Sequence, residues 1–391
     1  MIIYVACIAI AFTATSCTVK KDPSHSTSIN SVGISSVKTD ATDIDFSMLQ
    51  KTDSVALKYA TQFSIDKYGE YSLITISDKD KFFIVPENKD TPTNVPSHIT
   101  VLHQPLNNTY LVSSAVMDFL AKIEAMGCIQ FSGTKQNDWY IPEARQAMKD
   151  GAIQYAGKYN TPDYELLIGK NCPLAIENTM IYHKPDVKEK LEELGIAVFV
   201  ERSTHESHPL GRLEWIKAYG TLFNKEKEAD QYFEKKISEL APFMESENTS
   251  KKVAFFYVTQ QGTINVRKPY GYISKLISLA GGTYVPSSIS IEEENALSTF
   301  NMQAEDFYST CVNADIIIYN NNIAEDVKTK NDLLNKNDMF ADFHAVQTGN
   351  LYSVGRNFFQ ETTSMIDFKK DMHIILTDSE EELSSVIKIT E

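Results

Sequence analysis

The 391-residue sequence lacks the short motifs that mark most enzyme active sites. It contains no G-x-S-x-G nucleophile turn, no Walker phosphate loop, no H-E-x-x-H zinc pair, and no G-x-G-x-x-G after a predicted strand. Cysteine is scarce, with five residues and no C-x-x-C pair, so a disulfide framework and a thiol redox or zinc signature are both missing. We therefore expect a binding protein rather than an enzyme, with no intrinsic cofactor and no resident metal.

Positive charge is also in short supply. The 37 Lys and Arg residues are outnumbered by 52 Asp and Glu residues, which gives a net charge of −15. An acidic surface repels the phosphate backbone, so nucleic acid is not expected as a partner.

Long apolar runs are missing outside the amino terminus. Residues 1–12 carry no charge, and Ala14, Thr15 and Ser16 lead directly to Cys17, as in a bacterial lipobox. A dozen apolar residues fall short of the ~20 that a transmembrane helix needs, but they suit the core of a secretory signal. We predict a signal peptide over 1–16, lipidation of Cys17, and a flexible tether rich in Ser, Thr and Asp over 17–52. The protein is expected in the cell envelope, attached to a membrane through the lipid on Cys17. The alternative is a soluble protein with an apolar amino terminus.

What the sequence does have is a long helical pattern in the middle, from Lys225 to Met244. Its apolar residues recur at i, i+3 and i+4, which is the spacing of one helix face, and Asn224 in front is a suitable N-cap. Such a helix is roughly 30 Å long. We predict two lobes, residues 53–208 and 250–391, joined by a rigid interlobe helix within 209–246, with a binding cleft between them.

Both predicted lobes alternate short apolar strands with amphipathic helices. This alternation is typical of a parallel sheet with helices on both faces, so the expected fold class is α/β with two Rossmann-like lobes. In the first lobe we predict strands at 71–76, 81–86, 98–102, 128–131, 173–176 and 196–200, and helices at 111–126, 142–149, 162–168 and 185–194. In the second we predict strands at 253–258, 315–319 and 351–354, and helices at 272–280, 303–311 and 334–346, with further helices to the end.

Four stretches carry a family resemblance through their order along the chain. They are SHPLGRLEWIKAYGTLFNKEKEADQYFEKK (207–236), YGYISKLISLAGG (270–282), AEDFYSTCVNADIIIYN (304–320) and FADFHAVQTGNLYSV (340–354). Together they resemble class III periplasmic-binding proteins, the receptors of ABC importers for ferric siderophores, haem and vitamin B12, in a form typical of the Bacteroidetes branch. The resemblance covers residues 97–376.

The resemblance implies a monomer that holds a metal chelate between its lobes and delivers it to an ABC permease and its ATPase. In open α/β sheets, ligands bind beyond the carboxyl ends of the strands. Aromatic rings there suit the flat face of a macrocycle, and arginine suits carboxylates or phosphate. The candidate ligand-binding residues after the predicted strands are Trp139, Tyr140, Tyr182, Arg202, Glu206, His208, Tyr270, Tyr272, Asn320 and Arg356.

In this family one acidic residue on each lobe docks onto the permease. The resemblance places Glu305 at the second-lobe position. In the first lobe it places Pro185 near that position, with Asp186 next to it, which is a departure from the family pattern.

Structural roles compete with several of these assignments. Trp139 and Tyr140 also suit the cover of a helix end, and Glu206 suits the cap of a helix that begins at Pro209. Residues 205–208 read H-E-S-H, which does not place two imidazoles on one helical face. The alternative functions are a zinc or manganese receptor of an ABC importer, a lipoprotein that captures or senses a ligand without an importer, and a lipoprotein hydrolase.

Overall fold

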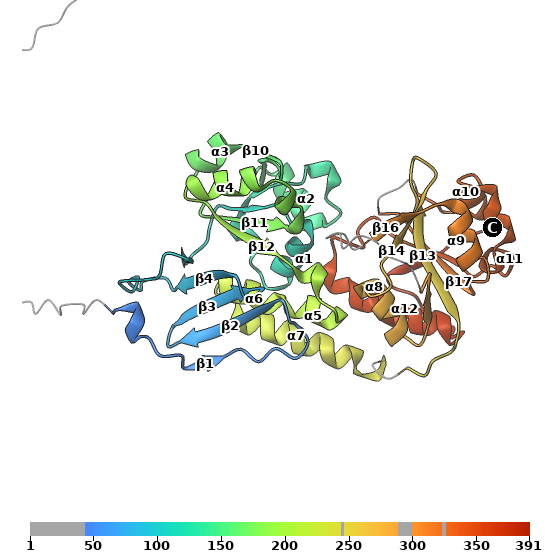
Figure 1. The fold of residues 1–391 in the computed structure, drawn as a ribbon, viewed down its shortest axis with the longest axis horizontal. Helices are drawn as coiled ribbons and strands as arrows, with labels where there is room; N and C mark the ends of the chain where they lie inside the picture. The colour runs from blue at the N-terminus through green and yellow to red at the C-terminus, as the bar shows by residue number, and fades with distance from the viewer. Residues whose placement is uncertain (1–43, 244–245, 288–298, 323–325) are drawn as a thin grey trace, which may run out of the picture. The chain divides into compact units, whose positions relative to one another are not determined.

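The computed structural model describes residues 44–243, 246–287, 299–322 and 326–391; the predicted signal peptide, Cys17 and most of the predicted tether lie outside these ranges. The described chain begins with a five-stranded sheet, which we call the amino-terminal sheet (blue in Figure 1). Its strand order is β1-β2-β3-β4-β5, antiparallel except for the parallel β4–β5 pair. The strands are β1 (Asp53–Ser54), β2 (Phe63–Tyr68), β3 (Tyr71–Ile76), β4 (Asp80–Val85) and β5 (Ile99–His103).

Both faces of the amino-terminal sheet are covered, because its side chains alternate between two clusters. Phe63 and Phe82 belong to the large core that contains Trp215, whereas Phe83 belongs to a smaller outer cluster. Phe46 packs on Phe83 with ring centroids 5.2 Å apart. The folded part therefore begins before residue 53, and the predicted tether is wrong over residues 44–52.

The first lobe is built on a parallel sheet of order β12-β11-β6-β7-β8. Its strands are β6 (Thr109–Leu111), β7 (Ile129–Ser132), β8 (Gln154–Tyr155), β11 (Leu174–Asn178) and β12 (Ala197–Glu201), and its helices are α1 (Ser114–Lys122), α2 (Pro142–Lys149), α3 (Tyr164–Gly169) and α4 (Pro185–Glu193). A small hairpin, β9 (Gly157–Lys158) and β10 (Thr161–Pro162), follows β8. The predicted helix 111–126 starts too early, because Tyr110 and Leu111 are fully buried in the sheet centre between β11 and β7.

Residues 209–246 do not form one interlobe helix. They form α5 (Pro209–Glu214), α6 (Ile216–Leu222) and α7 (Glu226–Leu240), followed by the short η6 (Ala241–Phe243). Asn224 does not cap α7, because its φ of +55° is left-handed and the chain turns there between α6 and α7. The two helices pack closely at Gly220, where a Cβ atom would lie 2.7 Å from that of Ala229.

The second lobe contains a mixed sheet of order β16-β14-β13-β17-β18-β19, with β15 beside β13. Strands β13 (Lys252–Val258), β15 (Thr283–Val285), β17 (Ile316–Asn320) and β18 (Leu351–Val354) are parallel, whereas β14 (Ile264–Arg267), β16 (Thr299–Met302) and β19 (Val386–Lys388) pair antiparallel. Its helices are α8 (Tyr272–Leu279), α9 (Ala304–Cys311), α10 (Lys330–Leu334), α11 (His344–Gln347) and α12 (Met365–Leu376).

Two predictions for the second lobe are wrong. The pattern over 334–346 is not one helix, because Asn337 caps a separate turn, η7 (Asp338–Asp342), before α11 begins. The chain does not finish in helices either, since β19 adds a strand to the edge of the sheet after α12.

Candidate functional site

The carboxyl ends of the parallel strands in the two lobes lead to residues that contact each other. In the first lobe, the backbone N–H of Tyr140 donates to Gln360 Oε1 at 2.8 Å, and Gln360 Nε2 donates to the carbonyl of Asp138 at 2.8 Å. The side chain of Tyr140 is also near enough to Arg356 to raise the pKa of its guanidinium. These contacts tie the loop after β7 to the loop after β18.

A large pocket lies at the carboxyl ends of β13 and β18 in the second lobe. Its volume is about 1000 Å³, at the upper end of the range for small-molecule sites. Most of its side chains are hydrogen-bonding groups without charge, and Arg356 lies on its wall. We call it the second-lobe pocket; it is lined by Tyr257, Val258, Thr259, Gln260, Gln261, Gly262, Asn265, Asn301, Asn335, Lys336 and Arg356.

Arg356 holds a defined position in this pocket. Its Nε donates to Asp326 Oδ1 at 2.8 Å, and its carbonyl accepts a hydrogen bond from Asn322. The side chain of Tyr140 and the hydrogen bond to Asp326 raise the pKa of the guanidinium above its usual value. Two of the sequence candidates, Tyr140 and Arg356, are thus brought together from different lobes.

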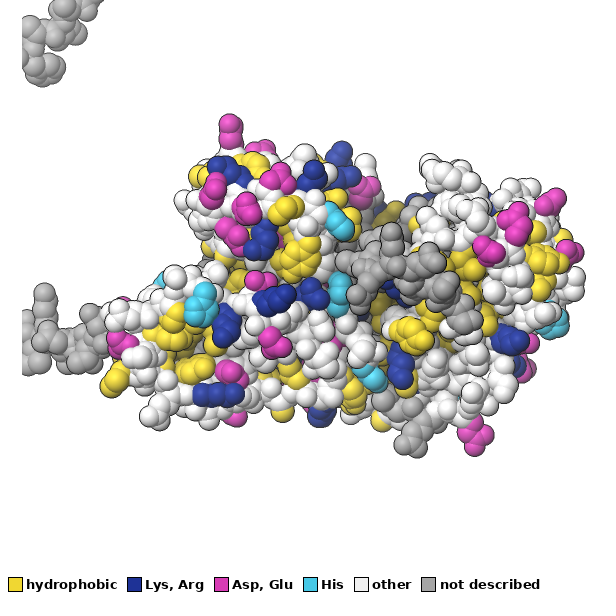
Figure 2. Space-filling view, viewed as in Figure 1, with side chains coloured by type: hydrophobic (Ala, Val, Ile, Leu, Met, Phe, Trp, Pro, Cys, Tyr) yellow, Lys and Arg dark blue, Asp and Glu magenta, His cyan; other side chains and the backbone are white. Residues whose placement is uncertain are grey.

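Basic groups of the second lobe lie close to two first-lobe histidines. Burial lowers the pKa of His205, and the charges of Arg202 and Lys268 lower it further. Burial and the charge of Lys275 likewise lower the pKa of His208. Both imidazoles therefore favour the neutral form. On the face seen in Figure 2, acidic and basic side chains are otherwise interspersed over the molecule.

Two candidates prove to be structural, and their interpretation as ligand contacts is wrong. Trp139 is fully buried, and its Nε1 donates to Ser132 Oγ at 3.2 Å. Glu206 is also buried, and its carboxylate accepts hydrogen bonds from the backbone N–H groups of Thr61 and Gln62 at 2.8 and 3.0 Å and from Trp215 Nε1 at 2.8 Å. It does not cap α5 either; that role belongs to His208, whose Nδ1 accepts from Leu210 N–H.

The remaining candidates are spread over both lobes. Tyr182 and Tyr270 are exposed, at 43% and 87%. Asn320 is buried at the end of β17 and accepts from the N–H of Asn322, while Arg202 Nε donates to Gln62 Oε1. Tyr272 is 3% exposed and lies beneath the guanidinium of Arg212.

Sequence reasoning missed a pair of carboxylates that hold the chain between β1 and β2 of the amino-terminal sheet. Glu214 is fully buried and accepts from the backbone N–H groups of Lys58, Tyr59 and Ala60 at 2.8 to 2.9 Å. With Glu206 it forms what we call the carboxylate clamp on residues 58–62. Gly211 lies between them, where a Cβ atom would be 2.8 Å from the Tyr59 carbonyl. Both carboxylates lie in the stretch ESHPLGRLEW (206–215), which the sequence analysis used only as part of the family resemblance.

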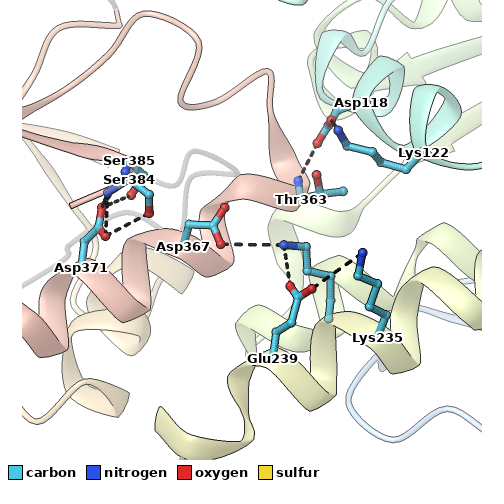
Figure 3. A network of polar contacts seen from close by, with 10 residues as sticks. Asp118, Lys122, Lys235, Glu239, Thr363, Asp367, Asp371, Ser384 and Ser385 are labelled. Carbon is cyan, nitrogen blue, oxygen red and sulfur yellow. Dashed lines mark hydrogen bonds and ion pairs between the residues drawn. The ribbon is translucent and has the colours of Figure 1, made fainter. Parts of the chain in front are cut away.

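The two lobes are also joined beside α7. Thr363 N–H, next to the start of α12, donates to Asp118 Oδ2 of α1 at 2.6 Å (Figure 3). Thr362 Oγ1 donates to the Ala115 carbonyl at 2.9 Å. Lys236 of α7 lies 3.8 Å from Asp367 of α12. Burial raises the pKa of Asp118, against the lowering effect of its hydrogen bonds to Thr363. These contacts connect α12 of the second lobe to α1 and α7 of the first.

The docking candidates sit on different lobes. Asp186 lies in the first turn of α4, Glu305 lies in the first turn of α9, and both are exposed. A carboxylate in the first turn of a helix is stabilised by the helix dipole, so their positions also have a local explanation. Their contact with a permease stays a prediction.

Glu177 at the end of β11 is a buried carboxyl without a hydrogen-bond partner on either oxygen. Burial raises its pKa from 4.5 to about 8. Between these two pH values the unfolded chain ionises while the folded protein keeps the proton, so this group makes stability fall as pH rises.

Replacing Glu177 by Gln is therefore expected to stabilise the protein at pH 8 by roughly 2 kcal/mol, since the amide stays neutral but is itself left without partners. Urea unfolding at pH 5, 6.5 and 8 measures the effect, with the exposed Glu165→Gln on α3 as control. A pH dependence equal to that of the wild type in Glu177→Gln would contradict the assignment.

The described residues contain no group of three or more His, Cys, Asp and Glu side chains arranged to hold a metal ion. Within the same ranges, no helix is both long and apolar enough to cross a membrane. The three described cysteines are free thiols; Cys172 and Cys311 are buried and Cys128 is half-buried.

Comparison with known proteins places this geometry in context. A family model described as periplasmic binding protein matches residues 114–357. An uncharacterised lipoprotein of Methanocaldococcus jannaschii is 30% identical over 361 residues, which covers 85% of this chain and 86% of the relative.

Two solved structures have a similar fold. A periplasmic haem-binding protein from Pseudomonas aeruginosa has a TM-score of 0.56 at 14% identity, covering 72% of this chain and 96% of that chain. A structure described as an ABC-type Fe³⁺-hydroxamate transport system from Saccharomonospora viridis has a TM-score of 0.55 at 18% identity, covering 69% and 93%. At these identities the likeness establishes the fold alone, and it confirms the predicted two-lobe α/β class.

Proposed function

Because the chain belongs to the class III periplasmic binding proteins, which are substrate-binding proteins and not enzymes, we propose that it captures a metal chelate between its lobes and delivers it to an ABC permease with its ATPase. The chelate is a ferric siderophore, haem or a cobalamin, and the protein performs no chemical step. Lipidation at Cys17 is part of the proposal, and the Methanocaldococcus lipoprotein supports it.

One observation carries the proposal. The second-lobe pocket is about 1000 Å³, lies at the carboxyl ends of parallel strands, and shares Arg356 with a side-chain contact to Tyr140 of the other lobe. This is where an open α/β sheet binds ligands. The pocket is lined by second-lobe residues, and the hydrogen bonds of Gln360 to Tyr140 and Asp138 bring the first lobe close to its Arg356 wall, which supports a ligand held between the lobes.

Binding is tested with the protein from residue 44 onward, offered haem, cyanocobalamin, ferrioxamine B, ferric citrate and Zn²⁺ in native mass spectrometry. Retention of one chelate at micromolar concentration is the expected result. Retention of Zn²⁺ in place of every chelate would favour the metal-receptor alternative, and failure to retain any of them would count against a transport role.

Tyr140→Phe and Arg356→Gln are expected to weaken binding of the retained chelate about tenfold each, because each removes a hydrogen-bond donor that the proposal places against the chelate, and such a bond is worth about 1.4 kcal/mol. The matched control is Tyr308→Phe, which removes a tyrosine hydroxyl that contacts Asp342 outside the pocket. Isothermal titration gives the dissociation constants. Unchanged affinity in both variants would remove these residues from the site.

A further inference from the structure

Arg212 of α5 is a buried cation that the described protein leaves without a polar partner. Its side chain is 3% exposed, and its Nε and Nη1 atoms make no hydrogen bond in the described ranges. No carboxylate in these ranges lies within ion-pair distance of it. The ring of Tyr272 lies against the guanidinium, 4.6 Å from the guanidinium carbon to the centroid.

Burying the Arg212 guanidinium without a counter-ion lowers the stability of the folded protein. Arginine keeps its charge in proteins, and a buried charge without a counter-ion is destabilising unless another group compensates for it. The face of an aromatic ring attracts the cation. It does not accept hydrogen bonds from the N–H groups that point outward in the plane of the guanidinium. The protein therefore provides stacking for Arg212 and leaves its in-plane donors free.

Two further buried polar groups of the first lobe also lack hydrogen-bond partners within the described ranges. The hydroxyl groups of Ser203 and Tyr219 are buried and unpaired. Burial raises the pKa of Tyr219 well above its usual value, so the phenol stays protonated and available as a donor; the charges of Glu201 and Arg212 act on the same phenol. Glu201 forms no ion pair with Arg212 in the described ranges; its carboxylate accepts from Ser203 N–H at 2.6 Å and from Ser113 Oγ at 3.4 Å.

Arg212 lies where the lobes meet. It projects from the first lobe onto Tyr272, the first residue of α8 in the second lobe, and both line a small cavity together with Thr362. The guanidinium of Arg267 is 5.8 Å from the same ring. In this structure the Tyr272 ring covers the guanidinium, so a ligand held between the lobes reaches Arg212 only by displacing that ring.

We propose that Arg212 binds an ionised carboxylate of the ligand, so that the cargo is an anionic chelate rather than a neutral or cationic one. This rests on the proposed function and narrows it: haem and carboxylate siderophores qualify, whereas a neutral cobalamin and a cationic hydroxamate do not. The cavity beside Arg212 has room for about one water molecule, at about 10 Å³. Entry of a carboxylate therefore displaces Tyr272 from the guanidinium.

The test compares wild type with Arg212→Gln and Arg212→Met, with the exposed Lys149→Gln on α2 as a control for loss of one positive charge. Titrations use haem and ferric citrate as anionic probes, and cyanocobalamin and ferrioxamine B as neutral and cationic ones. We expect wild type to bind an anionic probe and both Arg212 variants to bind it at least tenfold more weakly, with Lys149→Gln unchanged. The variants should melt no lower than wild type, because they remove an unpaired charge.

Tighter binding of cyanocobalamin or ferrioxamine B than of either anionic probe would overturn the inference while leaving the proposed function intact. Equal affinity of wild type and Arg212→Gln for the anionic probe would overturn it as well. If no chelate binds, the proposed function fails, and metal-free citrate then decides the inference alone: a saturable rise in the melting temperature of wild type that Arg212→Gln lacks supports it, and no such difference refutes it.

Discussion

Replacing Glu214 by Ala is expected to lower the free energy of unfolding by about 3–5 kcal/mol, the cost of breaking a buried charged network. Its fully buried carboxylate accepts hydrogen bonds from three consecutive backbone N–H groups, those of Lys58, Tyr59 and Ala60. Urea unfolding followed by circular dichroism measures the loss.

Glu234→Ala is the matched control. Glu234 also pairs with Lys58, through the lysine Nζ at 3.2 Å, but both side chains are more than half exposed. An exposed ion pair of this kind contributes less than about 1 kcal/mol. If the two variants lost the same stability, the carboxylate clamp would not be the anchor of residues 58–62.

The amino-terminal sheet, which the carboxylate clamp holds, is shared in part with a relative of this protein. The matched family region begins at residue 114, yet the Methanocaldococcus alignment covers 85% of this chain, more than residues 114–391 alone supply. The relative therefore shares part of the chain before residue 114. Because Phe63 and Phe82 share one core with Trp215, the amino-terminal sheet is part of the first lobe's fold.

Replacing Asp371 by Ala is expected to cost about 3 kcal/mol and to free the last strand. The fully buried Asp371 on α12 accepts hydrogen bonds from the backbone N–H groups of Ser384, Ser385 and Val386 and from both serine hydroxyls (Figure 3). Loss of the carboxylate leaves the buried N–H of Val386 unpaired and removes the hydrogen bonds of the two less buried serines. Hydrogen exchange over 384–390 should accelerate before the rest of the second lobe opens.

Asp378→Ala serves as the control for Asp371. Asp378 is 81% exposed and pairs only with Lys251 at 2.7 Å, so its loss is expected to change stability by less than about 1 kcal/mol. Protection of 384–390 that survives in Asp371→Ala would show that β19 is held by its pairing with β18 alone.

The sequence predicted the elements whose pattern is local. Residues 71–76, 142–149 and 351–354 form β3, α2 and β18 at the predicted bounds, because alternation, a proline at the first helical position and a continuous buried run are each legible within a few residues. The family resemblance was equally legible, since it depends on the order of such blocks.

The candidate site was predicted less well, because a side chain after a strand has two possible directions. Tyr140 and Arg356 meet across the lobes, whereas Trp139, next to Tyr140, points into the core and bonds Ser132. Adjacent residues in extended backbone project to opposite sides, and the packing of the neighbouring helix decides which side is buried. The local sequence alone therefore does not predict which of two adjacent side chains faces the site.

The sequence by itself determined the α/β class, the two lobes, the absence of catalytic motifs and the acidic balance, all of which follow from composition and short-range periodicity. Only the tertiary structure decided that Glu206 and Glu214 hold residues 58–62, about 150 positions away in the chain, and that Arg212 is buried against Tyr272 without a counter-ion. The reason is physical: a buried charge takes its role from the groups that folding brings to it, and those groups are distant in sequence.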